Sequence, residues 1–271
     1  MTAGSVPRED WREEFVPYFF GEGPRRLYAC HHLPAVVAAP AKAILICHAT
    51  GHEYERTHRT LRQLALQLAR SGHHVLRFDY RGTGDSAGKY AHSGPAEWRQ
   101  DVTTAIEECE RISGHRQICV IGLRLGATLA AQVAAVRQDV ESLVLYAPVA
   151  DGKSLLGEWE HAQAEYEHKH GRTTRHGMSD EVLGFALSDT FRAELTALAL
   201  PEPNPALRRV LILAEQAAEK GARQMAQALA SRGASVSIEP VDAPAIWRRE
   251  PFEAIVPFKL LRRIVAWMKE G

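Results

Sequence analysis

The amino-acid sequence predicts an α/β protein built on a mostly parallel, doubly wound sheet, and three observations lead to this class. Short apolar runs alternate with segments of helical period along most of the chain. The clearest runs, such as residues 43–47, are continuously apolar, as strands buried on both faces of a parallel sheet require. The connections between runs are short, which favours strands and helices that alternate in one layered domain.

Composition agrees with an ordinary globular chain of 271 residues, enough for one large domain or a core with an inserted subdomain. Lys plus Arg and Asp plus Glu number 33 each, and no basic tract is present, so we expect no nucleic-acid partner. No apolar stretch is long enough to span a membrane, and the polar start does not resemble a signal peptide. We therefore expect a cytoplasmic protein.

The first half of the chain predicts a hairpin followed by alternating strands and helices. Two extended segments, 14–20 and 26–33, flank the turn-forming residues 21–24, and thus predict an antiparallel N-terminal hairpin. The elements expected next are a Pro/Ala linker (34–40), a strand (43–47), a helix (57–71), a strand (75–78), a Gly-rich turn (79–88) and a helix (96–112).

The second half continues this alternation around one interruption. The expected elements are a strand (117–121), a helix (126–136), a strand (143–146), a strand (210–214), a helix (217–231), a strand (235–241) and a final helix (255–269). Residues 152–207 are polar, Glu/His-rich and partly helical, which predicts a lid inserted into a core formed by 1–151 and 208–271. The Glu and His residues at 165–170 lack the spacing of a metal site, and we expect no metal and no cofactor.

The most informative stretch is 118–129, where a β-branched apolar run meets Gly122, one residue at a sharp turn, and then Gly126 at the start of an Ala-rich helix. This is the layout of a nucleophile elbow, whose glycines let strand and helix pass close together. The central residue is Arg124. A guanidinium stays protonated and cannot attack a carbonyl, so the usual nucleophile is missing.

A second motif, the sequence Asp79-Tyr80-Arg81-Gly82-Thr83-Gly84-Asp85-Ser86, follows a predicted strand. With the elbow and the order of elements, it resembles the α/β-hydrolase fold over nearly the whole chain. The arginine at the elbow is similar to that of the exosortase A system-associated hydrolases, a branch related to serine aminopeptidase-like proteins. Residues 51–56, 184–188 and 243–247 look similar too. This resemblance implies a hydrolase-type fold. The retained pocket layout, with its unusual set of polar residues, leads us to expect acyl chemistry in a biosynthetic pathway.

In the α/β-hydrolase fold a catalytic serine is followed along the chain by an acid and then by a histidine. Glu215 and Asp151 stand at the two positions where the acid is expected. All 13 histidines lie at or before His176, so none follows the strand 235–241. The sequence therefore excludes a Ser-His-Asp mechanism, unless a histidine of the insertion replaces the base.

Two interpretations of Arg124 are open. In one, it is locked in a salt bridge with an acid from a neighbouring loop and the pocket is inert. In the other, it lies beside the N-terminus of the following helix and orients an anionic substrate or polarises a carbonyl. The acids expected at this edge of the sheet are Glu53, Glu55, Asp85 and Asp151.

The loop His48-Ala49-Thr50 follows a buried strand at the position where this fold places its oxyanion loop. His48 is expected either to act as general acid or base or to be a hydrogen-bonded loop histidine. We expect His52 and His58 to face solvent, and Trp159 and Trp247 to line an apolar pocket rather than to contact a cation. Cys47 is expected to be a buried, inert thiol.

The leading hypothesis is an enzyme that cleaves or rearranges an ester, thioester or lactone without a covalent nucleophile. The candidate catalytic residues are Arg124, His48, Glu53 and Asp151, and the candidate substrate contacts are Leu125, Ala49, Thr50, Asp85 and Trp247. The rival hypothesis is a non-catalytic protein that binds an anionic or acyl ligand, or an accessory subunit. The expected partner is a small molecule in both cases, and a homodimer is left open.

Overall fold

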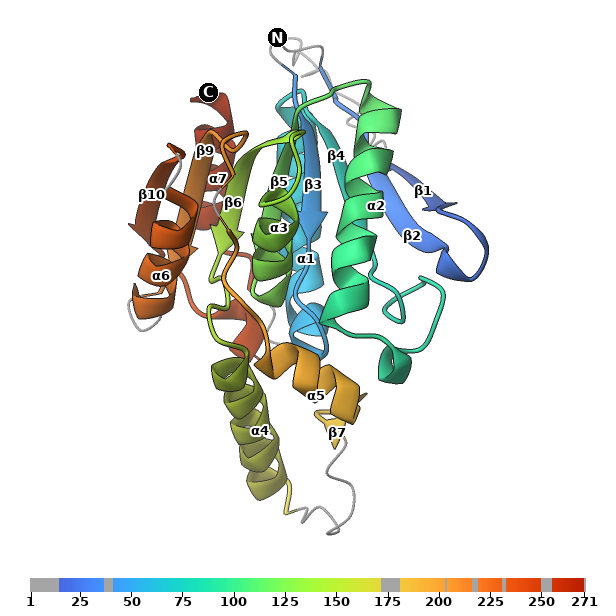
Figure 1. The fold of residues 1–271 in the computed structure, drawn as a ribbon, viewed down its shortest axis with the longest axis vertical. Coiled ribbons are helices and arrows are strands. Elements are labelled where there is room, and N and C mark those ends of the chain that lie inside the picture. Colours follow the sequence, from blue (N-terminus) through green and yellow to red (C-terminus); the bar gives the residue numbers. More distant parts are fainter. Residues whose placement is uncertain are drawn as a thin grey trace, which may run out of the picture.

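A computed structural model describes residues 15–36, 41–171, 181–202, 204–215, 219–230, 233–249 and 255–270. One eight-stranded sheet dominates it, with the order β1-β2-β4-β3-β5-β6-β9-β10. The strands β1 and β2 pair antiparallel, β2 pairs antiparallel with β4, and all other neighbours are parallel. The predicted parallel sheet with an N-terminal antiparallel hairpin is confirmed (Figure 1).

The strands of this sheet are β1 (Phe15–Phe20), β2 (Leu27–His32), β3 (Ala43–Cys47), β4 (His74–Phe78), β5 (Ile118–Leu123), β6 (Val140–Tyr146), β9 (Arg209–Ala214) and β10 (Ser235–Pro240). The helices are α1 (His52–Arg70), α2 (Pro95–Ser113), α3 (Leu125–Ala134), α4 (Gly152–Lys169), α5 (Asp189–Thr196), α6 (Glu219–Ala230) and α7 (Phe258–Lys269). Short 3-10 helices are η1 (Gly23–Arg25), η2 (Tyr90–His92) and η4 (Ile246–Arg248).

Two apolar cores hold the helices on opposite faces of the sheet. On one face, side chains of α1 and α7 such as Leu64 and Leu261 pack against β3, β5 and β6. On the other face, side chains of α2, α3 and α6 such as Ile106 and Met225 pack against the same strands. Because both faces are covered, the central strands are buried along their whole length, which is why their sequences are continuously apolar.

Between β6 and β9 the chain leaves the sheet. It forms α4 and α5 and a small hairpin of β7 (Glu181–Val182) and β8 (Phe185–Ala186), which lie beyond the carboxyl ends of the parallel strands (Figure 1). Leu155 and Trp159 of α4 and Phe191 of α5 join the core of the α2 face. The division of the chain into a core and a lid at 152–207 stays a prediction.

Most element boundaries agree with the sequence expectation, but the start of α1 does not. The predicted helix began at residue 57, whereas α1 begins at His52, directly after Gly51 with φ of +60°. Glu53 and Glu55 in its first turn favour this early start, because negative charge stabilises a helix N-terminus. The two glutamates expected on a loop are therefore in a helix. The last helix begins later than predicted, at Phe258 after Pro257.

Parts of four predicted segments lie outside the described residues: residue 14 of the first extended segment, 37–40 of the Pro/Ala linker, 172–180 and 203 of the insertion, and the ends of the helix 217–231. No described helix is long and apolar enough to cross a membrane.

The Gly-rich turn after β4 is a hydrogen-bonded loop centred on Asp79. The Asp79 carboxylate accepts from the backbone N–H of Asp85 at 3.1 Å and from the Tyr54 hydroxyl at 3.0 Å. Arg81 donates to Glu97 at 3.2 Å. Asp and Arg side chains thus hold this loop, and Asp79 and Asp85 line a cavity beside it.

Candidate functional site

The elbow predicted from the sequence is present between β5 and α3. Arg124 adopts φ of +55°, and its backbone N–H donates to the carbonyl oxygen of Tyr146 at 2.9 Å. A Cβ atom added to Gly122 would lie 2.3 Å from the Cα of Ala127, and one added to Gly126 would lie 2.2 Å from the carbonyl oxygen of His48. Only glycine fits at either position, so the elbow depends on both.

The side chain of Arg124 is bound by two carboxylates from distant parts of the chain. Its Nε donates to both oxygens of Glu53 in α1, at 3.1 and 3.3 Å, and its Nη2 donates to Oε2 of Glu158 in α4 at 2.7 Å. The exposed fractions of the side chains are 7% for Arg124, 2% for Glu53 and 41% for Glu158. One partner is therefore sealed inside the protein, whereas the other is open to solvent.

Two tryptophans enclose this ion pair. The indole N–H of Trp159 donates to Oε1 of Glu53 at 3.2 Å, and the ring of Trp247 lies 4.9 Å from the guanidinium carbon of Arg124. The expectation that neither tryptophan contacts a cation is wrong for Trp247, because its ring stacks on Arg124. Trp247 lies in η4, which follows β10 along the chain.

Burial and charge compete at this ion pair. Burial disfavours the charged form of Arg124, but Glu53 and Glu158 outweigh it and raise the pKa of the guanidinium. Burial raises the pKa of Glu53, although Arg124 and the indole N–H of Trp159 oppose the shift. Glu53 is thus a stronger base than an exposed glutamate.

A cavity of about 450 Å³ opens beside this group, between α1, α4 and η4. Its lining is rich in charged and aromatic side chains, namely His52, Glu53, Arg56, Glu158, Trp159, His161, Glu165, Trp247 and Arg248. The Nη2 atom of Arg248 lies 3.6 Å from Oε2 of Glu158. The cavity therefore carries both signs of charge around the carboxylate of Glu158.

His52 is part of this site, contrary to the expectation that it faces solvent. It is buried, and its ring lies 5.7 Å from that of Trp159 in an edge-on arrangement. Burial, with Arg56 and Arg124 nearby, lowers its pKa to about 3, so the imidazole is neutral at pH 7. The early start of α1 is the reason: the first turn of the helix, rather than a loop, turns His52 and Glu53 inward. His58 is exposed as expected.

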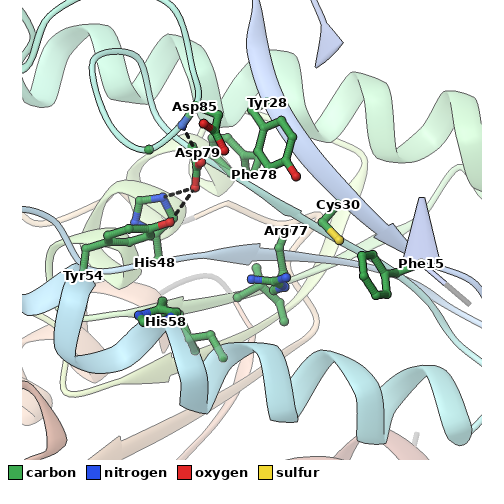
Figure 2. A pocket seen from close by; sticks show the side chains of 13 residues that line it. Phe15, Tyr28, Cys30, His48, Tyr54, His58, Arg77, Phe78, Asp79 and Asp85 are labelled. Atoms are coloured by element: carbon green, nitrogen blue, oxygen red, sulfur yellow. Dashed lines mark hydrogen bonds and ion pairs between the residues drawn. The ribbon is translucent and has the colours of Figure 1, made fainter. Parts of the chain in front are cut away.

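His48 is not brought to Arg124. Its Nε2 lies 3.9 Å from Asp79, and its ring packs 4.5 Å from the rings of both Tyr54 and Tyr80. Figure 2 shows His48, Tyr54 and Asp79 pointing toward one another in a second cavity, of about 420 Å³, which also includes Asp85. Burial lowers the pKa of His48 despite Asp79. The Nδ1 atom of His48 is hydrogen-bonded to the carbonyl oxygen of Ala49 at 2.5 Å, and its role as general acid or base stays a prediction.

Asp151 lies away from the elbow at the start of α4. It is exposed, and its carboxylate accepts from the backbone N–H of Lys153 at 3.0 Å and from the Ser154 hydroxyl at 2.6 Å. This geometry is that of a helix N-cap, which explains its position without a catalytic role. Glu55 is exposed on α1.

The residues predicted to contact substrate at the oxyanion loop do converge with the elbow. Ala49, Thr50 and Leu125 are buried, and the carbonyl oxygen of His48 lies against Gly126 at the start of α3. The Thr50 hydroxyl has no hydrogen-bond partner in the described part of the protein. The loop and the first turn of α3 therefore form one wall beside Arg124.

Among the described residues, no group of three or more His, Cys, Asp or Glu side chains is arranged to hold a metal ion. The four cysteines are buried and free, and burial raises the pKa of Cys47 to about 12. Cys47 is therefore an inert thiol, as its apolar run predicted.

Sequence reasoning missed three residues of the site: His52, Glu158 and Arg248. His52 is adjacent to Glu53 in the first turn of α1, and recognising the helix start at Gly51 could have found it. Glu158 belongs to a segment whose polar composition predicted only a solvated helix face. Arg248 follows Trp247 directly, but nothing in the local sequence indicates that it points toward Glu158.

Part of the chain is similar to a known protein family and to a human protein. Residues 38–177, just over half of the chain, match the family model described as serine aminopeptidase, S33. A segment of 137 residues is 33% identical to the human protein ABHD12B and covers 49% of this chain and 36% of that protein. The chain thus spans little more than a third of the length of this curated relative.

Solved structures share the fold at low sequence identity. Est1E from Butyrivibrio proteoclasticus, solved with ferulic acid bound, superposes with a TM-score of 0.62 at 15% identity, over 93% of this chain and 98% of that one. The mouse α/β hydrolase domain-containing protein 10 superposes with a TM-score of 0.58 at 18% identity, over 94% and 99%. The Pyrococcus furiosus esterase Pf2001 gives 0.61 at 15% identity, over 99% and 95%.

Proposed function

The chain belongs to the serine aminopeptidase, S33 family of α/β hydrolases, and on this premise we propose that it acts on an acyl substrate with an anionic group and forms no acyl-enzyme intermediate. The substrate class is an ester, thioester or lactone, and we place the reaction in a biosynthetic pathway. Segment 152–207 acts as the lid over the site.

One observation carries the proposal: Arg124 occupies the elbow and is held by one buried and one solvent-open carboxylate. The guanidinium offers a planar fork that matches a carboxylate or an oxyanion. It also lies at the N-terminus of α3, where free backbone N–H groups favour negative charge. The cavity lined by Glu53 and Glu158 opens beside this fork.

The proton chemistry falls to residues that line the same cavity. Glu53, whose pKa is raised by burial, takes the proton from a water molecule as the water oxygen attacks the acyl carbon. Arg124 stabilises the negative charge that develops on the carbonyl oxygen, and the proton then passes to the leaving oxygen or sulfur. His52 is neutral and offers a hydrogen bond beside this path.

The test is hydrolysis of a panel of acyl thioesters, esters and lactones with and without a terminal carboxylate. Arg124→Lys and Arg124→Gln are expected to lower kcat/KM for the anionic members by about 10²-fold or more, because the fork or its charge is lost. The matched control is Arg192→Gln, which removes a half-buried arginine that pairs with Glu160 and does not line the cavity, and which should leave the rates unchanged. Circular dichroism checks that each variant is folded. Equal rates for the wild type and both Arg124 variants would refute the proposal.

A second candidate is a non-catalytic protein that binds an anionic or acyl ligand, alone or as an accessory subunit. The observation that favours it is that Arg124 and Trp247, stacked on each other, stand where the nucleophile and the base are expected. It predicts thermal stabilisation by acyl anions without turnover. Both candidates predict no covalent labelling of the protein by a serine-reactive fluorophosphonate, and labelling at a serine would contradict both.

A further inference from the structure

The carboxylate of Glu158 lies between two arginines that belong to distant parts of the chain. Oε2 of Glu158 is 2.7 Å from Nη2 of Arg124 at the elbow and 3.6 Å from Nη2 of Arg248 in η4. One oxygen atom thus lies within ion-pair distance of two guanidinium groups. Without the carboxylate of Glu158, the guanidinium groups of Arg124 and Arg248 would face the same point of the cavity. Glu53 would then be the remaining close counter-charge of Arg124 among the ion pairs described.

The two carboxylates that hold Arg124 differ in how easily they can separate from it. Glu53 is 2% exposed, contacts Nε with both oxygens and also accepts from Trp159. Glu158 is 41% exposed and reaches the site from α4, in the segment that lies outside the sheet. An ion pair with one exposed partner is weak, because water can replace the arginine as the partner of the glutamate.

The charges of the cavity support an exchange of anions. Its lining includes the acids Glu53, Glu158 and Glu165 and the bases Arg56 and Arg248, with Arg124 behind Glu158. The Nη1 atom of Arg56 is bound to the carbonyl oxygen of Trp247 at 3.2 Å. When Glu158 turns out to solvent, Arg124 and Arg248 are the two groups that lose a carboxylate.

From this geometry we propose that Glu158 is a built-in occupant of an anion subsite formed by Arg124 and Arg248. The external ligand displaces Glu158 with a carboxylate or phosphate group and is held by both guanidiniums. The inference rests on the proposed function and adds to it the anionic group of the substrate, its second binding residue, Arg248, and the side chain that competes with it. Arginine is suited to both anions, because its fork binds two oxygens at once.

The experiment measures the dissociation constants of three matched probes, hexanoate, hexyl phosphate and the neutral hexanamide, by isothermal titration calorimetry. Glu158→Gln is expected to bind the anionic probes about tenfold or more tightly than the wild type and to bind hexanamide unchanged. The control is Glu160→Gln, on the same helix but outside the cavity lining, whose exposed carboxylate pairs with Arg192 at 2.8 Å. It should leave all three constants unchanged. The ratio between hexanoate and hexyl phosphate then identifies the preferred anion.

Two further variants separate the possible outcomes. Adding Arg248→Gln to Glu158→Gln is expected to remove most of the gain, because the second guanidinium is gone. Glu158→Asp keeps the charge but shortens the side chain, so it should give a smaller gain in affinity for the anionic probes. This variant provides an independent measurement if Glu158→Gln folds poorly. If Glu158→Gln binds the anions no better than the wild type while Arg124→Gln loses them, the subsite occupant is refuted and the proposed function survives. If Arg124→Gln also leaves the dissociation constants of the anionic probes unchanged, the subsite occupant and the proposed function are both refuted.

Discussion

The side chain of Arg124 shows how a single residue can depend on the rest of the molecule. It combines a positive φ, a buried charge and a position at a helix N-terminus, where a cation is unfavourable. Each of these costs free energy, and Glu53 and Trp247 offset the cost, Glu53 by accepting a hydrogen bond from Nε that its two oxygens share and Trp247 by a stacked ring. A buried pair of this kind is sensitive to the removal of one partner, because the other charge is left without compensation.

Glu53→Gln is therefore expected to lower the free energy of unfolding by about 3 kcal/mol, since Arg124 loses its buried counter-charge. Glu158→Gln removes an exposed partner and should cost at most about 1 kcal/mol. Urea denaturation of the two variants and the wild type gives these values. Equal losses for both variants would show that the burial of the partner is unimportant here.

At the scale of elements, the site depends on how closely α3 approaches β5 and the loop after β3. Gly126 lets the first turn of α3 lie against the carbonyl oxygen of His48, so the helix N-terminus, the loop 48–50 and Arg124 form one surface. The same elements could not adopt this geometry with any larger residue, because the contact is with rigid backbone. The close approach is what converts three separate segments into a pocket wall.

Gly126→Ala is expected to destabilise the protein by about 3 kcal/mol or more, because its Cβ would overlap backbone atoms that cannot move away. The matched control is Gly157→Ala, a substitution on the exposed side of α4 where the added Cβ meets nothing within 4 Å. That variant should be up to about 1 kcal/mol more stable, because alanine favours the helix. Thermal unfolding measures both, and a neutral Gly126→Ala would contradict the close contact.

At the scale of the whole molecule, several buried histidines in different elements have lowered pKa values. Burial lowers the pKa of His31 and His73 to about 4 and that of His32 and His52 to about 3. His31, on β2, shares a hydrogen bond with His74, in which Nε2 of His31 lies 3.1 Å from Nδ1 of His74. The nearby carboxylate of Glu108 opposes the lowering of the pKa of His31. These histidines stay neutral in the folded state at a pH at which the unfolded chain binds protons.

The pH dependence of stability follows from that difference. Below pH 6.5 the unfolded chain takes up protons that the folded chain refuses, so stability is lost as the pH falls from about 6.5 toward 4. Each such proton contributes a slope of about 1.4 kcal/mol per pH unit. Melting temperatures measured between pH 7.5 and 5 should decline, and His73→Gln should reduce the decline while the exposed His58→Gln should not. A melting temperature that stays constant over this range would contradict the shifts.

Local patterns in the chain were sufficient for the fold and for the position of the elbow. Continuous apolar runs predicted the parallel strands, since both faces of those strands are buried, and Gly122 and Gly126 marked a turn that no other residue permits. The absence of histidine after residue 176 likewise required no structure. In each case the physical cause acts on the residues themselves or on their nearest neighbours.

The partners of Arg124 could be decided only by the tertiary structure. Glu53 was among several acids expected at this edge, but its inward direction depends on α1 beginning at His52. Glu158 lies 34 residues from Arg124 along the chain, on a helix whose local sequence predicts a solvated face. His48 lies near Asp79 rather than at the elbow, because the turn after β4 packs beside it. Such choices depend on how separate segments pack, because electrostatic partners are set by distance in space and by burial.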